Sequence, residues 1–323
     1  MATPQPLTVP VPPTPPPAAV GRTLRERFRG IAFILPAVVI LGLFLVYPAY
    51  YTIRLAFYES DFFFGFTHWV GLANFKELLT GDKDFLDLST FPPQGALANN
   101  VRWLIFYTSL SLLFGLALAV LAVRVRYERT VKTAVFIPMA ISATAVGVIW
   151  LLVYSPDIDQ GLLNALIHGI WNGYNPISFV GRPSTVNYAL IFAYVWASTG
   201  FVMVVLSAAI KGIPNDVIEA ARVDGAGEWA IFRRIVLPML SLPISIVTVW
   251  LLINVIKVFD IIYVMTNGGP GTSSRVIAYT MYVETFSNSR AGYGAAVAVI
   301  MLILLLPVMI LNVTRFRSSR VVT

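Results

Sequence analysis

The chain has 323 residues, of which 57% are hydrophobic and 12% are charged, and it contains no cysteine. Soluble domains carry about a quarter charged residues, so this composition predicts an integral membrane protein. The lack of cysteine excludes disulfides, thiolate catalysis and cysteine-ligated metals. His68 and His168 have no partner at ligand spacing, so we expect no metal site and interpret both as surface residues.

The chain begins with a segment dominated by Pro, Ala, Thr and Val. It has no apolar core, so residues 1–30 are interpreted as a proline-rich, disordered tail. The apolar run that follows is too long for a cleavable signal peptide and lacks a clear small-residue cleavage site. We therefore expect the first span to act as an uncleaved insertion signal.

Six apolar runs of about 20 residues or more are long enough to cross a bilayer. They lie near residues 31–57, 99–123, 131–154, 187–210, 240–265 and 291–314. The predicted fold is therefore all-α, with a six-span transmembrane domain over 31–317 and a short tail over 318–323. Pro138 and Pro243 are expected to kink the third and fifth spans, since proline removes a backbone donor.

The basic residues are distributed unevenly among the loops. One set of alternating segments carries fifteen of the 23 lysines and arginines: Arg22, Arg25, Arg27, Arg29, Arg124, Arg126, Arg129, Lys132, Lys211, Arg222, Arg233, Arg234, Arg315, Arg317 and Arg320. The other loops carry only five, so we expect both termini to be cytoplasmic. The net charge of +7 is then a consequence of membrane topology, and no nucleic-acid partner is expected.

The fourth span places an aromatic ring near hydroxyl groups, at Trp196 and Thr199. Sugar sites combine rings for the apolar sugar face with polar groups for its hydroxyls. Packing of the ring beside small residues is the alternative. The third span carries a small-residue run that includes Ser142 and Gly147, for which helix packing is the favoured role.

A short polar stretch, residues 212–238, separates the fourth and fifth spans and is predicted to fold as a helix–turn–helix. Pro214 suits the start of a helix, and Asp216 with Glu219 has the spacing of a capping box. Gly225 can adopt the left-handed conformation that ends a helix. Glu228 then lies early in a second helix, with Arg233 and Arg234 in its later half.

The fifth span carries polar residues at three-residue spacing: Asn254, Lys257 and Asp260. On a continuous helix they rise along one face. Ionisable side chains at membrane depth usually face a bundle interior or a water-filled cavity, so these residues are candidates for a substrate path. A structural salt bridge between Lys257 and Asp260 is the main alternative.

The order Glu219-Ala220-Ala221, three residues, Gly225, nine residues, Ile235-x-Leu237-Pro238 resembles the hallmark of ABC-importer permease subunits. The resemblance extends from about residue 31 to 317. It implies that this loop is a coupling helix that docks on an ATPase subunit, with Glu219, Ala220, Ala221, Asp224 and Gly225 as the coupling residues.

Further motifs resemble the carbohydrate-uptake subgroup, the maltose and glycerol-phosphate permeases. These are Phe259-Asp260-x-Ile262-Tyr263, Thr266-x-Gly268-Gly269-Pro270 and Gly71-Leu72-x-Asn74-Phe75. The first adds Tyr263 to the candidate path, and the third suggests either contact with a substrate-delivering protein or a plain turn. The chain also resembles α-glucoside-type permeases, which implies a sugar such as maltose or trehalose.

The resemblance implies several partners: a second permease subunit, an ATPase dimer that binds ATP and Mg²⁺, an extracytoplasmic sugar-binding protein and membrane lipid. It also implies location in a bacterial or archaeal cytoplasmic membrane. The chain itself has no phosphate-binding loop, so it is expected to bind no cofactor and to be no enzyme. An ion-coupled carrier or channel is the alternative, although no repeat relates the two halves.

Overall fold

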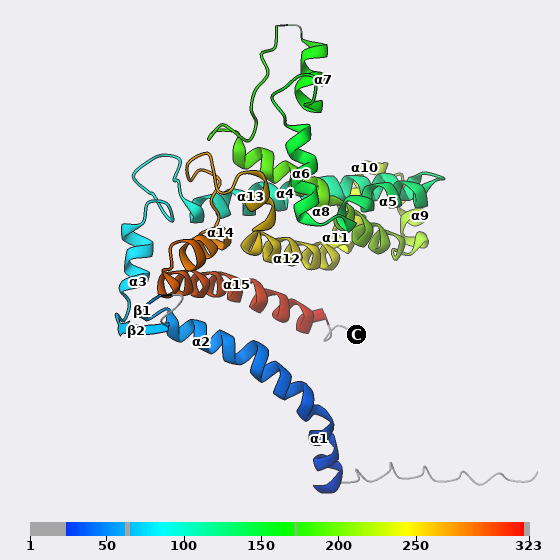
Figure 1. Ribbon diagram of the computed structural model, residues 1–323. Coiled ribbons are helices and arrows are strands. Elements are labelled where there is room, and N and C mark those ends of the chain that lie inside the picture. The colour runs from blue at the N-terminus through cyan, green and yellow to red at the C-terminus, as the bar shows by residue number, and fades with distance from the viewer. Residues whose placement is uncertain (1–23, 62–64, 172, 320–323) are drawn as a thin grey trace, which may run out of the picture. The chain divides into compact units, whose positions relative to one another are not determined.

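The computed structural model describes residues 24–61, 65–171 and 173–319. The chain divides into two compact units, with the boundary in the sequence between Tyr51 and Thr52. Helices form most of the described structure (Figure 1). Most of the expected tail lies outside the described residues, but α1 begins at Leu24, so residues 24–30 are helical rather than disordered. Likewise, α15 extends to Ser319, which shortens the expected C-terminal tail.

The first unit consists of α1 (Leu24–Leu41), a π turn (Gly42–Val46) and the beginning of α2 (Tyr47–Leu55). Its described apolar side chains are almost all exposed, and Phe33–Leu55 is long and apolar enough to cross a membrane. The π turn lies just before Pro48. Since proline has no N–H to donate to the carbonyl of Phe44, the regular series of α-helical hydrogen bonds is interrupted there.

The second unit is built around two long helices, α4 (Ala96–Arg124) and α8 (Val186–Lys211), which pack along each other (Figure 1). Their close approach depends on glycine: a Cβ on Gly115 would lie 2.5 Å from the Cβ of Val202. The main hydrophobic core lies here and includes Trp103, Tyr107 and Met203. Within this core, Tyr107 Oη donates a hydrogen bond to Ser198 Oγ at 2.9 Å, so that the two buried hydroxyls are partners.

The third predicted span is sharply bent, as the position of Pro138 predicted. It consists of α5 (Glu128–Phe136), a 3₁₀ turn (Ile137–Ala140) and α6 (Ala143–Val153), with an angle of 102° at the break. Ser142 caps α6 by accepting a hydrogen bond from the N–H of Ala145 at 3.2 Å. Gly147 packs closely against Val264, so its expected packing role is confirmed.

A second bend, of 66°, lies just before the fifth span. The helix there runs through α10 (Glu228–Ile231), a π turn (Phe232–Val236) and α11 (Leu237–Met239), and α12 (Ser241–Lys257) follows. The bend falls at Leu240 rather than at Pro243. As at Pro48, the π turn lies immediately before a proline, here Pro238, which leaves the carbonyl of Arg234 without its usual donor.

The fifth span is not one helix over 240–265, as the sequence suggested. α12 ends at Lys257, and α13 (Asp260–Met265) begins after a two-residue break. α14 (Ile277–Tyr282), a π turn (Val283–Ser287) and α15 (Ala291–Ser319) complete the chain. The described residues therefore supply four uninterrupted candidate spans, or six if each bent pair counts as one.

The remaining elements form the loops. A hairpin of β1 (Tyr58–Asp61) and β2 (Gly65–Trp69) pairs Glu59 with His68. α3 (Ala73–Lys76) and a π turn (Glu77–Gly81) follow it, and α7 (Leu162–Ile170) and α9 (Asn215–Val223) lie in later loops. Asn74 ties the first loop together because its Nδ2 donates to the carbonyls of Ala56 and Tyr58 at 2.9 and 3.0 Å.

Candidate functional site

Residues 212–238, the expected coupling segment, fold as the predicted helix–turn–helix of α9 and α10. Gly225 has φ +81°, as expected for the residue that ends α9. The N–H of Gly225 donates to the Arg222 carbonyl at 3.0 Å, and the N–H of Ala226 donates to the Ala221 carbonyl at 2.9 Å. This pair of bonds is a Schellman motif, which satisfies the last carbonyls of the helix.

The predicted capping box is wrong. α9 begins at Asn215, with Pro214 as the residue before it, so Asp216 is already inside the first turn. No side-chain hydrogen bond caps this helix. The acidic side chain still suits the positive end of the helix dipole. Proline therefore sets the start of α9 by its fixed backbone angle rather than through a capping pair.

An apolar cluster holds the coupling segment against the membrane helices. Its buried members are Ile213, Ile231, Val236 and Leu240, and Ala221 and Ala226 pack against them. Ala221 of the Glu-Ala-Ala motif is therefore a packing residue, half-buried against this cluster. Glu219 and Ala220, by contrast, are exposed on α9. Burial of such aliphatic side chains stabilises the segment by about 1.5–3 kcal/mol for each one fully buried.

Ion pairs add a second connection. Glu228 accepts from Arg222 at 3.0 Å and from Arg124, at the end of α4, at 2.8 Å. Hydrogen bonding and charge from Arg222, together with Arg124, lower the pKa of the Glu228 carboxyl. Glu228 therefore links α9, α10 and the end of α4 through one carboxylate.

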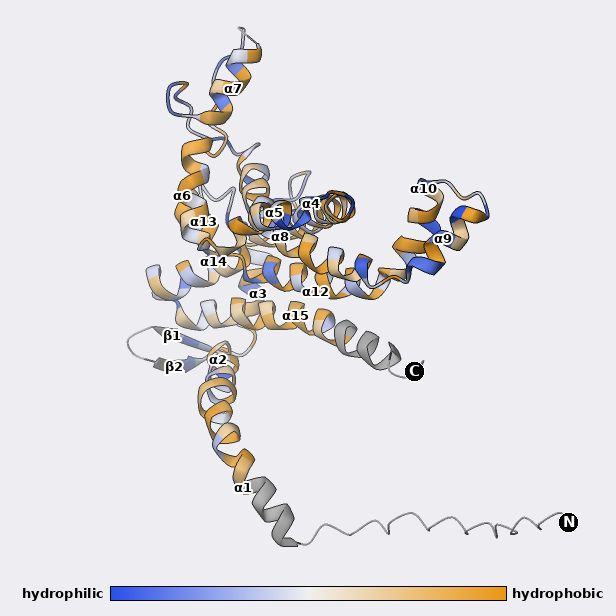
Figure 2. Cartoon of the chain, turned by 90° about the vertical axis from the view of Figure 1, so that its right-hand side faces the viewer, coloured by the Kyte–Doolittle hydropathy of each residue, from blue (hydrophilic) through white to orange (hydrophobic). Residues whose placement is uncertain are grey.

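Three large apolar side chains on this polar segment remain exposed. Val223 is 87% exposed, Trp229 is 71% exposed, and Val217 is also exposed. Figure 2 shows hydrophilic residues gathered on α9 and the turn that follows it. No motif in the sequence marks these side chains. Helical spacing is the available signal, because Val217 and Ala220 share a face of α9 that does not include the packed Ile218 and Ala221.

The candidate substrate-path residues of the fifth span lie on both sides of the break. Lys257 is the last residue of α12 and Asp260 is the first of α13, and both are exposed. The expectation that they rise with Asn254 along one continuous helix is therefore wrong. No ion pair joins Lys257 to Asp260 within the described residues, so the predicted alternative of a structural salt bridge is not observed.

The other candidate residues for the substrate path differ in the exposure of their side chains. Nδ2 of Asn254 donates to the carbonyl of Trp250 at 2.8 Å. Tyr263 is exposed and stacks on Phe259 at 5.5 Å between ring centroids. Trp196 is partly exposed and meets the ring of Trp150 edge-on.

Thr199 is buried, and its Oγ1 donates to the carbonyl of Val195 at 2.7 Å. Its hydroxyl is thus already hydrogen-bonded within its own helix.

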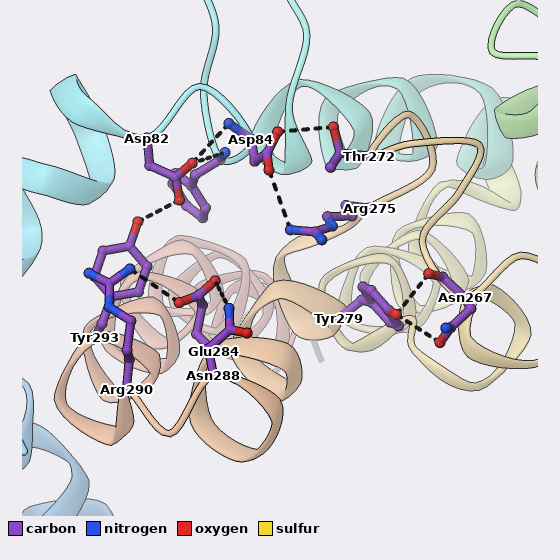
Figure 3. Close-up of polar contacts among 11 residues, drawn as sticks. Asp82, Asp84, Asn267, Thr272, Arg275, Tyr279, Glu284, Asn288, Arg290 and Tyr293 are labelled. Carbon is purple, nitrogen blue, oxygen red and sulfur yellow. Dashed lines mark hydrogen bonds and ion pairs between the residues drawn. The ribbon is translucent and has the colours of Figure 1, made fainter. Parts of the chain in front are cut away.

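The Thr266-to-Pro270 motif builds the loop after α13. Thr266 Oγ1 and Ser274 Oγ lie 2.8 Å apart, and Ser274 Oγ donates to the Gly269 carbonyl at 2.7 Å. Tyr279 Oη donates to Asn267 at 2.8 Å (Figure 3). Gly268 has φ +81°, and a Cβ there would lie 2.6 Å from the Tyr279 ring. Glycine is therefore required at this position by both its backbone angle and its packing.

The same loop connects to earlier and later parts of the second unit through charged residues (Figure 3). Asp84 accepts from Thr272 Oγ1 at 3.0 Å and pairs with Arg275 at 3.5 Å. Tyr293 Oη donates to Asp82 at 2.6 Å. The loop around Asp82 and Asp84 is thereby held to the α13–α14 loop and to α15.

Comparison with known proteins agrees with these features. Residues 111–315 match the family of binding-protein-dependent transport system inner membrane components. The chain is 41% identical to the osmoprotective compounds uptake permease protein GgtC of Synechocystis, over 89% of this chain and 98% of that protein. It is 37% identical to the alpha-glucoside transport system permease protein AglF of Rhizobium meliloti, over 92% and 85% of the two chains.

Among solved structures, the fold is similar to a chain of a bacterial ABC transporter involved in the import of the acidic polysaccharide alginate. The TM-score is 0.72 and the identity is 24%, over 91% of this chain and 97% of the other. The family assignment does not favour an ion-coupled carrier or channel. The chain belongs to the binding-protein-dependent transport system inner membrane component family, and it is a transmembrane permease subunit of an ABC importer rather than an enzyme.

Proposed function

We propose that this permease imports a carbohydrate, with an α-glucoside such as maltose or trehalose as the candidate substrate. Its similarity to AglF over nearly the whole chain supports this class. The fifth span also suits a sugar, since it carries the amide of Asn254 and the exposed ring of Tyr263, and Trp196 exposes a second ring on α8. Rings cover the apolar face of a sugar, and an amide both donates to and accepts from hydroxyls.

The permease would work as one half of a translocation path, with a second permease subunit, an ATPase dimer that binds ATP and Mg²⁺, and an extracytoplasmic binding protein. In this proposal the chain crosses the membrane six times, each bent pair counting as one span. Both termini and the coupling segment face the cytoplasm. The distribution of lysine and arginine supports this orientation.

The coupling segment is the contact with the ATPase in this proposal. One observation carries it: Val223 and Trp229 are exposed on a segment that a buried apolar cluster holds in place. Exposed aromatic and aliphatic side chains on a rigid element are typical anchors of protein interfaces. Glu219, Ala220, Asp224 and Gly225 lie on the same short stretch and would orient or border this contact.

The test is uptake by the complete complex in proteoliposomes with the binding protein and ATP. Maltose and trehalose are compared with methionine, and we expect ATP-dependent uptake of an α-glucoside only. Uptake of methionine without any sugar would refute the carbohydrate class.

Reporter fusions after Arg129, Glu228 and Arg317 should read cytoplasmic, whereas those after Asp82, Asn172 and Ser287 should read external.

A matched pair of variants tests the coupling contact through the affinity of the permease for the ATPase. Val223→Asp changes a side chain that is 87% exposed on α9, and Ile170→Asp changes one that is 89% exposed on α7. Because the proposed contact covers Val223, a charge at this position should weaken ATPase binding about tenfold or more, which corresponds to roughly 1.4 kcal/mol. Only Val223→Asp should have this effect. Equal effects of the two substitutions would remove the support for docking at α9.

A further inference from the structure

The break in the fifth span leaves a backbone carbonyl that needs a new partner. Val258 is extended, with φ −60° and ψ 122°, and Phe259 has φ −143° and ψ −59°. In a continuous helix the Val255 carbonyl would accept from the N–H of Phe259. Here the remaining backbone donor is the N–H of Val258, at a long 3.4 Å. Inside a membrane protein such a carbonyl is costly to leave unsatisfied.

Asn100 of α4 supplies that partner. Its side chain is 6% exposed, and its Nδ2 donates to the Val255 carbonyl at 3.0 Å. Its Oδ1 accepts from the N–H of Ile277 at 2.8 Å. Ile277 is the first residue of α14, a helix that has no side-chain cap of its own. One buried amide thus satisfies both the end of α12 and the start of α14.

The neighbouring asparagine holds the loop between these two points. Asn99 Nδ2 donates to the carbonyls of Ser273 and Arg275 at 2.8 and 2.7 Å. Asn187 of α8 donates to the same Ser273 carbonyl at 2.8 Å. The segment from residue 255 to 277, which contains the break, is therefore attached to the α4–α8 pair at its two ends and in its loop.

We propose that Asn100 is a positioning residue for transport: it fixes the break between α12 and α13 and thereby sets the direction in which Lys257 and Asp260 are presented. The role in transport rests on the proposed function, in which the break borders the substrate path. An aliphatic side chain of similar size could pack in the same place but could serve neither backbone group. The break would then be free to shift toward other backbone arrangements.

Because the chain has no cysteine, single cysteines can report on this geometry in the complete complex in membranes. Asp260→Cys reports on the break, and Ile170→Cys, at a residue of α7 that is 89% exposed, reports on a part of the chain outside both proposed contacts. Each is combined with Asn100→Leu, which removes both hydrogen bonds. The matched control is Thr108→Val on the same helix: Thr108 is 8% exposed, and its hydroxyl has no hydrogen-bond partner in the described part of the chain.

We expect Asn100→Leu to change the rate at which a charged maleimide labels Asp260→Cys by about fivefold, the population shift that one net hydrogen bond supplies. Labelling of Ile170→Cys should stay the same, and Thr108→Val should change neither rate. If Asn100→Leu fails to assemble, Asn100→Ala replaces it, since alanine also removes both hydrogen bonds and occupies less space. That variant should also alter labelling at the break.

Unchanged labelling of Asp260→Cys in an assembled Asn100 variant would overturn the proposal, and so would equal changes at both reporters, which would indicate general loosening. Sugar uptake, measured with maltose and trehalose in the absence of the cysteine reporters, separates the two levels of the argument. Altered labelling with reduced uptake supports both. Altered labelling with normal uptake supports the control of the break by Asn100 and contradicts the substrate path proposed there.

Discussion

The coupling segment and the fifth-span break differ in where their geometry comes from. The turn of the coupling segment is closed by bonds within a few residues, from Gly225 to Arg222 and from Ala226 to Ala221. The break is held by Asn100, whose two partners lie 155 and 177 positions away in the chain. A locally determined element can present one face to a partner and keep its shape. An element held by distant contacts depends on the packing of the whole bundle.

The largest effect is expected where the coupling segment is disturbed. Glu219→Lys should leave membrane insertion intact but abolish substrate-stimulated ATP hydrolysis, because the residue is exposed beside the proposed ATPase contact. Gly225→Val should do the same, since a β-branched residue at φ +81° costs about 1–2 kcal/mol and redirects α9. The measurement is ATPase activity of the reconstituted complex with and without loaded binding protein. Normal stimulation in both variants would contradict a coupling role.

Two glycines with the same φ of +81° compare the regions directly. A Cβ on Gly225 would meet nothing within 4 Å, whereas one on Gly268 would lie 2.6 Å from the Tyr279 ring. Gly225→Ala should therefore cost only backbone strain, about 1 kcal/mol. Gly268→Ala should cost a further 1–3 kcal/mol or so from overpacking. Melting of the detergent-solubilised complex measures both, and the reverse order would show that the loop after α13 is less constrained than the turn after α9.

The fifth-span residues should separate substrate contact from structure. Asn254→Ala should lower uptake efficiency about tenfold, the value of one hydrogen bond to the substrate, while assembly is retained. Lys257→Ala should also assemble, because Lys257 is exposed and forms no ion pair with Asp260 in the described structure. Exchanging the charges of Lys257 and Asp260 should therefore not improve uptake or assembly relative to either single reversal. Uptake kinetics and complex yield measure these outcomes; wild-type uptake by Asn254→Ala would place the path on other spans, such as the one that carries Trp196.

The smallest effect is expected at the Glu228 ion pairs. Their side chains are more than half exposed, so Glu228→Gln should leave the stability of the complex almost unchanged. Glu128→Gln should cost more, since its carboxylate is largely covered and pairs with Lys132 and Lys211 at 2.5 and 2.6 Å. A double-mutant cycle between Arg124 and Glu228 measures the coupling. A larger loss at Glu228 than at Glu128 would reveal a stronger connection between α4 and the coupling segment.

The parts of the fold that depend on short-range patterns could be predicted from the sequence. Apolar run length located the candidate spans, Pro138 marked the bend in the third span, and Gly225 marked the end of α9. The capping box could not be judged from spacing alone, because Pro214 places Asp216 inside the first turn. Exposure of Val223 could be predicted only in part, since helical spacing shows which residues share a face but not which face is covered.

The break after Lys257 could not be predicted in this way. No proline or glycine lies between Asn254 and Asp260, and the apolar pattern continues through the break. We attribute the break to the hydrogen bonds of Asn100, which lies on a helix that the sequence pattern predicts as an ordinary span. Paired asparagines at the start of an apolar run are the one local signal, because buried amides require partners.

Docking of the exposed end of α9 on the ATPase can be tested by site-specific photo-crosslinking. A photoreactive amino acid is placed at Val223 or, as the control, at Ile170, and the complete complex is illuminated in membranes. We expect a crosslink to the ATPase from position 223 and none from position 170. A crosslink from position 170, with none from position 223, would contradict both the docking face and the predicted orientation of the chain.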